Sequence, residues 1–316
     1  MPMPSSRLTK LIAAAGLGIA LLWGYWPVLA TEVERWTTDP KYSHGYFVPL
    51  FSAWLLWSRF RRRAGAVAAN PWVGSWWGLL PVLVGVGLHT CGEYYFIDWL
   101  SELAFLPALA GLCWCIGGWR LLRLAGPSIG FLAFMLPLPY RIEVALANPL
   151  QRLATVASTY LLQTLGVTAF SEGNIIVLNH GVIGVVEACS GLGMLVTFFA
   201  LATAVAIVLK RPLLDRILVV ASAVPIAVLA NIIRITATGI LFETLGDRVA
   251  LVVYHDLAGW LMMPLALVLI GGGLLILSRL LVEPPAEAPA HEIGLNLGRP
   301  TAALPKSPQK DKAIGV

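Results

Sequence analysis

The segment EACSGLGMLVTFFALATAVAIVLK, residues 187–210, decides how this chain folds. Its apolar run at 190–209 contains no charged residue, and about 20 such residues let an α-helix cross a hydrocarbon layer about 30 Å thick. A thiol, Cys189, stands directly before that run. The segment therefore predicts a membrane-spanning helix with a reactive side chain at its N-terminal end.

The whole chain has the composition of a polytopic membrane protein. Hydrophobic residues make up 58% of its 316 residues, charged residues make up only 12%, and the mean hydropathy is +0.79. Several further apolar runs are long enough to cross a bilayer. This composition excludes an ordinary soluble domain and predicts an all-α polytopic membrane fold with about eight transmembrane helices.

The positive charge indicates orientation rather than a nucleic-acid partner. The formal net charge is +5, and Lys and Arg gather on the cytoplasmic side of membrane proteins. We therefore expect the lipid bilayer as partner, no nucleic acid, and both termini in the cytoplasm. The basic clusters that mark the inside lie at 7–10, 59–63, 120–123, 210–216 and 279.

The remaining polar segments separate the predicted spans. Residues 31–45 read as an outer loop, 140–166 as an amphipathic helix on the outer surface, and 168–187 as a small outer β-hairpin. Residues 1–282 form the predicted membrane domain, and 283–316, rich in Pro, Ala and charge, form a disordered cytoplasmic tail. The predicted spans are 11–30, 46–60, 73–91, 103–118, 125–136, 190–209, 218–233 and 257–277.

Three chemically distinct side chains fall on one face of this topology. With the basic clusters inside, Cys189, Arg234 and His255 all lie at the outer ends of their helices. A residue at the opposite face would stand about 30 Å away from the others. The topology thus predicts that a thiol, a guanidinium and an imidazole share one depth.

These groups suit acyl transfer. The partial positive charge at a helix N-terminus stabilises a thiolate at Cys189, which can attack a peptide carbonyl. His255 is suited to carry protons, and Arg234 to stabilise the oxyanion. The backbone at Ser190 and Gly191 adds possible amide donors. No metal or organic cofactor is required, and none of the four cysteines has the spacing of a zinc site.

Each residue alone has a plainer explanation. A single membrane cysteine most often packs as a small hydrophobe, a histidine at a helix start usually forms interfacial hydrogen bonds, and an arginine usually anchors a helix at the lipid surface. The conjunction of Cys189, Arg234 and His255 favours catalysis. Two alternatives remain: a transporter or channel that uses Arg234 and His255 as charges along its pathway, and a Cys-dependent membrane acyltransferase.

Six short motifs stand at ordered separations along the chain: DPKYSHG (39–45), MLPLP (135–139), EGNIIVL (172–178), EACSGL (187–192), NIIRI (231–235) and HDLAGW (255–260). With these motifs the chain resembles the exosortase/archaeosortase family of membrane cysteine transpeptidases. The resemblance covers about 36–278. Gly193 departs from the family pattern, in which many members carry Arg after the CysSerGly tripeptide, so these residues assign no subfamily.

The resemblance implies an activity, a substrate and a location. Its motifs assign Cys189 as nucleophile, Arg234 as stabilising cation and His255 as acid and base. The implied partners are membrane-anchored secreted proteins whose C-terminal sorting tail has a ProGluPro-like motif, a transmembrane helix and a basic cluster. The implied site is the outer face of the cytoplasmic (inner) membrane of a prokaryote. We expect substrate contacts from Tyr42, Ser43, His44, Glu187, Ser190 and Asn231.

Overall fold

The computed structural model describes residues 5–69, 73–179, 181–185, 191–209 and 211–246, with isolated helical residues between 265 and 275. These residues belong to one compact unit, Met1–Leu277. Four predicted site residues lie outside the described residues, as does the tail predicted at 283–316. They are Glu187, Cys189, Ser190 and His255.

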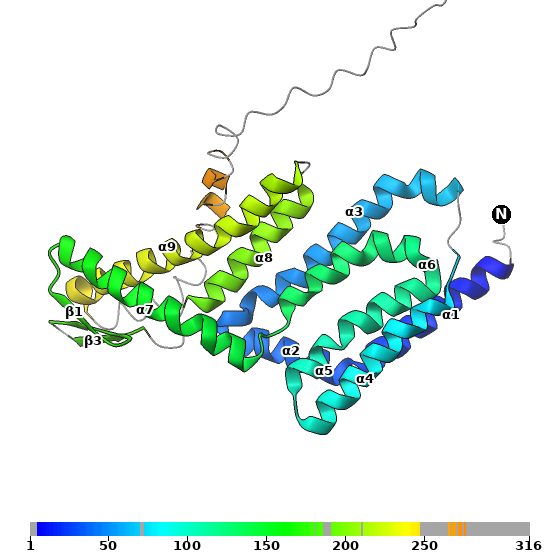
Figure 1. The fold of residues 1–316 in the computed structure, drawn as a ribbon, viewed down its shortest axis with the longest axis horizontal. Coiled ribbons are helices and arrows are strands. Elements are labelled where there is room, and N and C mark those ends of the chain that lie inside the picture. The colour runs from blue at the N-terminus through cyan, green and yellow to red at the C-terminus, as the bar shows by residue number, and fades with distance from the viewer. Residues whose placement is uncertain are drawn as a thin grey trace, which may run out of the picture. The chain divides into compact units, whose positions relative to one another are not determined.

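The described part of the chain is mostly helical (Figure 1). Its order is α1 (Ser5–Gly24), α2 (Trp26–Thr38), η1 (Pro40–Tyr46), α3 (Phe47–Ala69), η2 (Trp76–Gly78), α4 (Leu79–Tyr95), α5 (Asp98–Leu103), α6 (Phe105–Phe131), η3 (Leu132–Met135), α7 (Tyr140–Thr164), β1 (Ala169–Glu172), β2 (Ile175–Leu178), β3 (Gly181–Gly184), α8 (Leu192–Val208) and α9 (Leu213–Leu245).

Two of the described helical segments are long and apolar enough to cross a membrane. They are Asp98–Met135 and Leu213–Leu245, and Ala14–Gly24 with Trp26–Thr38 makes a third if this bent pair is one span. Helix α8 is apolar but has only 17 residues. The predicted membrane protein is confirmed as mostly helical, while the predicted number of eight spans remains a prediction.

The N-terminal part differs from its prediction at two places. The apolar run 11–30 is divided at Tyr25, where the chain bends by 60°, because Pro27 lacks the amide hydrogen that would bond the preceding helical turn. Residues 31–45, predicted as a loop, are almost entirely helical in α2 and η1. Helix α2 buries Val28, Glu32 and Trp36 on one face, so its polar residues include an inward-facing carboxylate.

Helices α4 and α6 approach each other through glycines. A methyl group at Gly85 would lie 2.8 Å from the Cβ of Ala108, and one at Gly111 would lie 2.6 Å from the carbonyl oxygen of Gly78. Helix α6 is interrupted at Gly118, whose φ of +65° and ψ of −168° are not helical. This break falls between the two spans predicted at 103–118 and 125–136.

The small β-hairpin predicted at 168–187 is present as a three-stranded antiparallel sheet. Strand β2 pairs with β1 through Phe170 and Val177, and with β3 through Ile176 and Ile183. The register pairs Leu178 with Gly181, so the chain reverses a second time over two residues, as in a tight hairpin. The second reversal adds a third strand to the hairpin.

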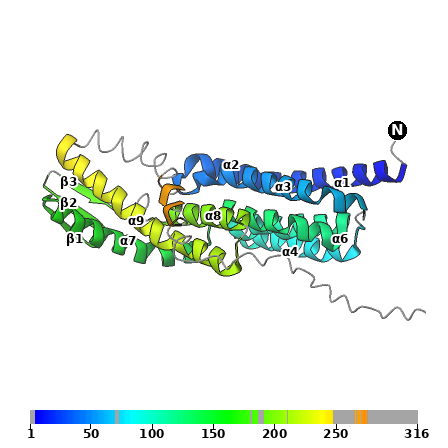
Figure 2. The same cartoon turned by 90° about the horizontal axis from the view of Figure 1, so that it is seen from above.

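This sheet lies against the helix pair α7 and α9, as both views show (Figure 2). Ile176, Leu162 and Ile235 are completely buried in the core that joins sheet and helices. The Ser158 hydroxyl of α7 donates to the carbonyl oxygen of Ile232 in α9 at 3.3 Å. The amphipathic helix predicted at 140–166 is thus present as α7, and its buried face holds α9.

Candidate functional site

The first turn of α8 packs on the middle of α9. Gly191 precedes α8 with a left-handed φ of +73°, a conformation that favours glycine. A methyl group at this position would lie 2.9 Å from the side-chain Nδ2 of Asn231. Gly191 therefore lets the backbone that follows the CysSer pair reach the face of α9 that carries Asn231.

Asn231 and Arg234 lie one helical turn apart on that face. Asn231 is 2% exposed, and its Oδ1 accepts a hydrogen bond of 3.0 Å from Nη2 of Arg234. The Arg234 backbone is also engaged, because its carbonyl oxygen accepts from the Thr238 hydroxyl at 2.9 Å. The Asn231 amide thus orients a guanidinium that is only partly exposed.

The turn η1 is fixed against α2, η3 and α8. Asp39 caps it by accepting from the Lys41 amide at 2.9 Å. Gly45 leaves space for the Trp36 ring, whose Nε1 donates to the Met135 carbonyl oxygen at 3.2 Å. On the other side, a methyl group at Gly193 would lie 2.9 Å from the Cα of Lys41. The DPKYSHG motif therefore packs directly on the first turn of α8.

His44 is enclosed at the junction of η1, η3 and α8. It is only 4% exposed, its Nε2 lies 3.1 Å from the Phe134 carbonyl oxygen, and its Nδ1 lies 3.2 Å from Thr197 Oγ1. Burial lowers the pKa of His44 below its ordinary value, and hydrogen bonding to the Phe134 and Lys41 backbone opposes the shift. We therefore expect a neutral imidazole near pH 7.

Tyr42 and Ser43 differ in accessibility. The Tyr42 ring is 6% exposed, and burial, helped by the nearby Glu143 carboxylate, raises the pKa of its hydroxyl to about 12. Ser43 is exposed. A substrate can therefore reach Ser43 directly, whereas Tyr42 and His44 are surrounded mainly by protein, and the contacts predicted for all three remain hypotheses.

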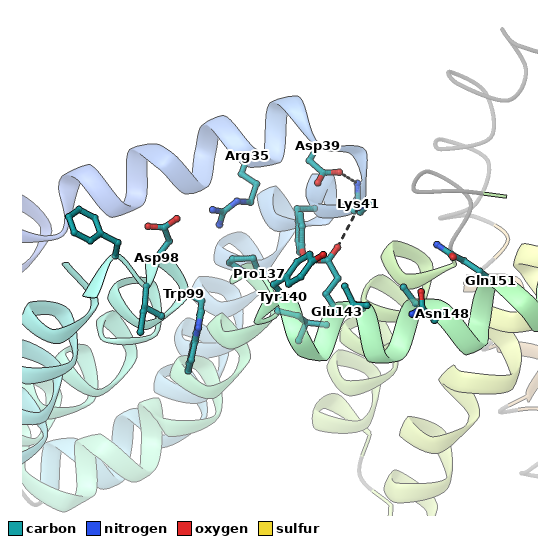
Figure 3. A pocket seen from close by; sticks show the side chains of 16 residues that line it. Arg35, Asp39, Lys41, Asp98, Trp99, Pro137, Tyr140, Glu143, Asn148 and Gln151 are labelled. Carbon is teal, nitrogen blue, oxygen red and sulfur yellow. Dashed lines mark hydrogen bonds and ion pairs between the residues drawn. The ribbon is translucent and has the colours of Figure 1, made fainter. Parts of the chain in front are cut away.

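A polar cleft opens between η1, α5 and α7, with Tyr42 in its wall (Figure 3). Its volume is about 700 Å³, within the usual range for ligand sites. Lys41 Nζ lies 3.4 Å from Glu143 Oε1 across this cleft. Arg35 also lines it, but its Nη1 is bound at 2.8 Å by both Glu32 Oε1 and Glu102 Oε1, which are buried.

The described residues therefore gather part of the predicted site. Gly191, Asn231 and Arg234 converge where α8 meets α9, and η1 with His44 adjoins the same turn of α8. Within the described ranges, no group of three or more His, Cys, Asp or Glu side chains is arranged to hold a metal ion. The prediction of a cofactor-free site is not tested by this observation.

Sequence reasoning missed Thr197 and Lys41. Thr197 lies in an apolar helix, where a single hydroxyl carries no functional signal, and its role depends on His44, 153 residues away. Lys41 belongs to a motif used only for family resemblance, and its pairing with Glu143 spans 102 residues. Neither contact follows from local sequence patterns.

Comparison with known proteins gives one family. The family model described as transmembrane exosortase matches residues 36–272, which is most of the chain. The match contains η1, the lining of the cleft except Arg35, the α8–α9 contact and all the residues predicted to form the site. No curated protein and no solved structure matches the chain.

Proposed function

Since this chain belongs to the transmembrane exosortase family, we propose that it is a cysteine transpeptidase that cleaves C-terminal sorting signals of exported proteins at the outer face of the cytoplasmic membrane. Cys189 acts as the nucleophile, Arg234 as the cation that stabilises the oxyanion, and His255 as the acid and base. The substrates carry a short motif of ProGluPro type followed by a transmembrane anchor.

One contact carries this proposal: Gly191 packs on Asn231, the residue that orients Arg234. Cys189 precedes Gly191 by two residues, and trans peptide geometry keeps their Cα atoms within about 7.6 Å. The chain that carries Cys189 thus enters α8, through Gly191, beside the part of α9 that carries Arg234. This supports the nearness of two motifs that are more than 40 residues apart in the sequence.

The proposed chemistry proceeds through a thioester. The Cys189 thiolate attacks the scissile carbonyl carbon, the C–N bond breaks, and His255 protonates the departing amine. An acceptor, either water or an amine, then loses a proton to His255 and attacks the thioester. The C–S bond breaks, and the thiolate of Cys189 is regenerated.

Arg234 suits the oxyanion for two reasons. Its guanidinium is a planar cation with several N–H donors, and the Asn231 Oδ1 fixes the direction of its Nη2 before substrate arrives. Preorganised donors stabilise developing charge without a reorganisation cost. Losing such a donor typically slows the reaction by about 10²–10³-fold.

The substrate contacts surround this centre. Ser190 and Glu187 flank the nucleophile in sequence, and Asn231 stands behind Arg234. Ser43 is exposed on η1, beside Tyr42 and His44. A sorting motif next to a transmembrane anchor would be held at one depth, so the substrate would find these residues by a search within the membrane plane.

Co-expression tests the proposal. A host protein with the expected C-terminal motif, helix and basic tail is expressed with the wild-type chain, and its size and release from membranes are measured. Cys189→Ala should abolish processing. Cys91→Ala, which changes an exposed cysteine of α4, should leave processing intact. Unchanged processing in Cys189→Ala would reject the thiol mechanism.

A further inference from the structure

The polar cleft changes in character along its length (Figure 3). Lys41 and Glu143 form their ion pair between Asp98 and Trp99 on one side and Asn148 and Gln151 on the other. The backbone of Lys41 also packs against Gly193 in the first turn of α8. The cleft therefore has one aromatic and acidic end, lined by Phe96, Asp98 and Trp99.

The aromatic side chains at the far end are placed for contact with a ligand. Phe96 is 92% exposed, although its backbone has a left-handed φ of +55° that a non-glycine residue adopts at a cost in energy. Trp99 is 37% exposed. Both residues line the cleft, which also contains charged groups.

The charges of the cleft favour a cation. The two buried carboxylates that bind Arg35 neutralise it, and Lys41 is paired with Glu143. Asp39 and Asp98 remain as additional negative charges in the lining. No cation lies within ion-pair distance of Asp98 in the part of the chain that the structure describes.

An exposed carboxylate that lines a cleft together with exposed aromatic rings is a favourable setting for an ammonium or guanidinium group, because both the charge and the ring faces attract it. The cleft also presents the side chains of Asn148 and Gln151, whose amides can pair with a peptide backbone. Lys41 of the same lining packs against Gly193, which follows Cys189 by four residues in the sequence.

We propose that this cleft binds, in extended form, the substrate segment next to the scissile bond, and that Phe96, Asp98 and Trp99 take a basic side chain of that segment. The proposal rests on the proposed transpeptidase function. It assigns Asp98 and Trp99 as specificity residues that select substrates by charge at one position outside the membrane anchor.

A set of substrates tests the charge selection. Each residue outside the anchor is changed in turn to Lys, Gln or Glu, and kcat/KM is measured with the full chain in nanodiscs. At one position the wild type should prefer Lys over Glu by about 5-fold, the range expected for an exposed charge with ring contacts. Asp98→Asn should bring this ratio to about one, and Asp98→Lys should reverse it.

Matched controls separate the possible outcomes. Glu93→Gln removes an exposed acid of α4 that does not line the cleft, and it should leave the ratio unchanged. A ratio unaffected by both Asp98 substitutions, while Cys189-dependent cleavage continues, would overturn the proposal and leave the proposed function standing. Loss of Cys189 dependence would reject the proposed function instead.

A binding measurement makes the inference independent of turnover. The same substrate segment, carrying a photoreactive group, is crosslinked to the Cys189→Ala chain, and the adducts are mapped by mass spectrometry. Adducts should appear within 96–99, and crosslinking there should weaken with Asp98→Lys. Adducts confined to other segments would refute the assignment.

A lipid headgroup is the other source of an ammonium group. Cleavage is therefore compared in nanodiscs with and without phosphatidylethanolamine. If the cleft binds the peptide, the cleavage rate should depend on the charge of the substrate residue both with and without this lipid. A rate that depends on Asp98 only when this lipid is present, whatever the substrate residue, would assign the cleft to lipid and reject the peptide.

Discussion

His44 Nδ1 lies 3.2 Å from Thr197 Oγ1, and the same hydroxyl lies 2.7 Å from the carbonyl oxygen of Gly193. The Phe134 carbonyl only accepts, so Nε2 of His44 carries a hydrogen. When His44 is neutral, Nδ1 therefore carries no hydrogen, so a hydrogen bond between the two side chains needs the single proton of the Thr197 hydroxyl, which can also be donated to Gly193. His44 and Gly193 thus compete for one hydroxyl in the first turns of α8.

Thr197→Val should destabilise the protein because it leaves the buried Nδ1 of His44 without a donor. We expect a loss of about 1–3 kcal/mol in the free energy of unfolding. Thr197→Ser keeps the hydroxyl and should cost much less. Chemical unfolding in nanodiscs measures the difference, and equal effects of the two substitutions would show that this hydrogen bond does not stabilise α8.

Acid should weaken the fold through His44. Its pKa is lowered in the folded state, so below the ordinary pKa near 6.5 the unfolded chain binds a proton that the folded chain resists. The free energy of unfolding is therefore unaffected by His44 titration above this value, and it declines as the pH falls toward the lower pKa of the folded state. Unfolding temperatures between pH 7.5 and 5 should fall more steeply, by about 2–4 °C, for the wild type than for His44→Asn. Parallel curves would exclude His44 as the cause.

Gly191→Ala should impair both folding and cleavage. The new methyl group meets Asn231 at 2.9 Å, and the φ of +73° is unfavourable for alanine. We expect a stability loss of about 1–2 kcal/mol and a fall of at least about 10-fold in kcat, because Asn231 orients Arg234. Gly130→Ala in α6, where nothing lies within 4 Å, is the matched control and should be neutral or stabilising. Equal cleavage rates for the two variants would contradict the proposed contact.

Arg35→Met should destabilise the junction of α2 and α5 strongly. It leaves the carboxylates of Glu32 and Glu102 buried without their shared cation, at a cost of about 3–5 kcal/mol. Glu32→Gln should be far milder because Arg35 keeps its ion pair with Glu102 and the new amide oxygen can still accept a hydrogen bond from Arg35. Unfolding of the two variants under identical conditions distinguishes them, and a mild Arg35→Met would show that the carboxylates are satisfied in another way.

Apolar runs and local amphipathicity predicted much of the secondary structure. The helix expected at 140–166 is α7, and the apolar run before Leu209 contains α8. These features depend on neighbouring residues, whose spacing is visible in sequence. The Asn231–Arg234 contact is also a local feature that spacing reveals, since residues three apart on a helix lie on one face.

Long-range and turn-dependent features were less predictable. The contact of Lys41 with Gly193 depends on packing between distant segments, and no sequence period encodes it. The bend at Tyr25 was missed because hydrophobicity continues through it, while its cause is the missing amide hydrogen of Pro27. The strand β3 lies within the hairpin predicted at 168–187, but its pairing with β2 could not be read from the sequence, because a turn sequence shows where a chain reverses and not whether pairing continues beyond it.

Gly193 couples the position of η1 to that of α8. A methyl group at Gly193 would lie only 2.9 Å from the Cα of Lys41, so the turn can pack this closely on the helix only when the residue has no side chain. A bulkier residue at this position would require the turn to move away from α8. Because Lys41 lines the cleft, this single substitution would also change the shape of the cleft wall.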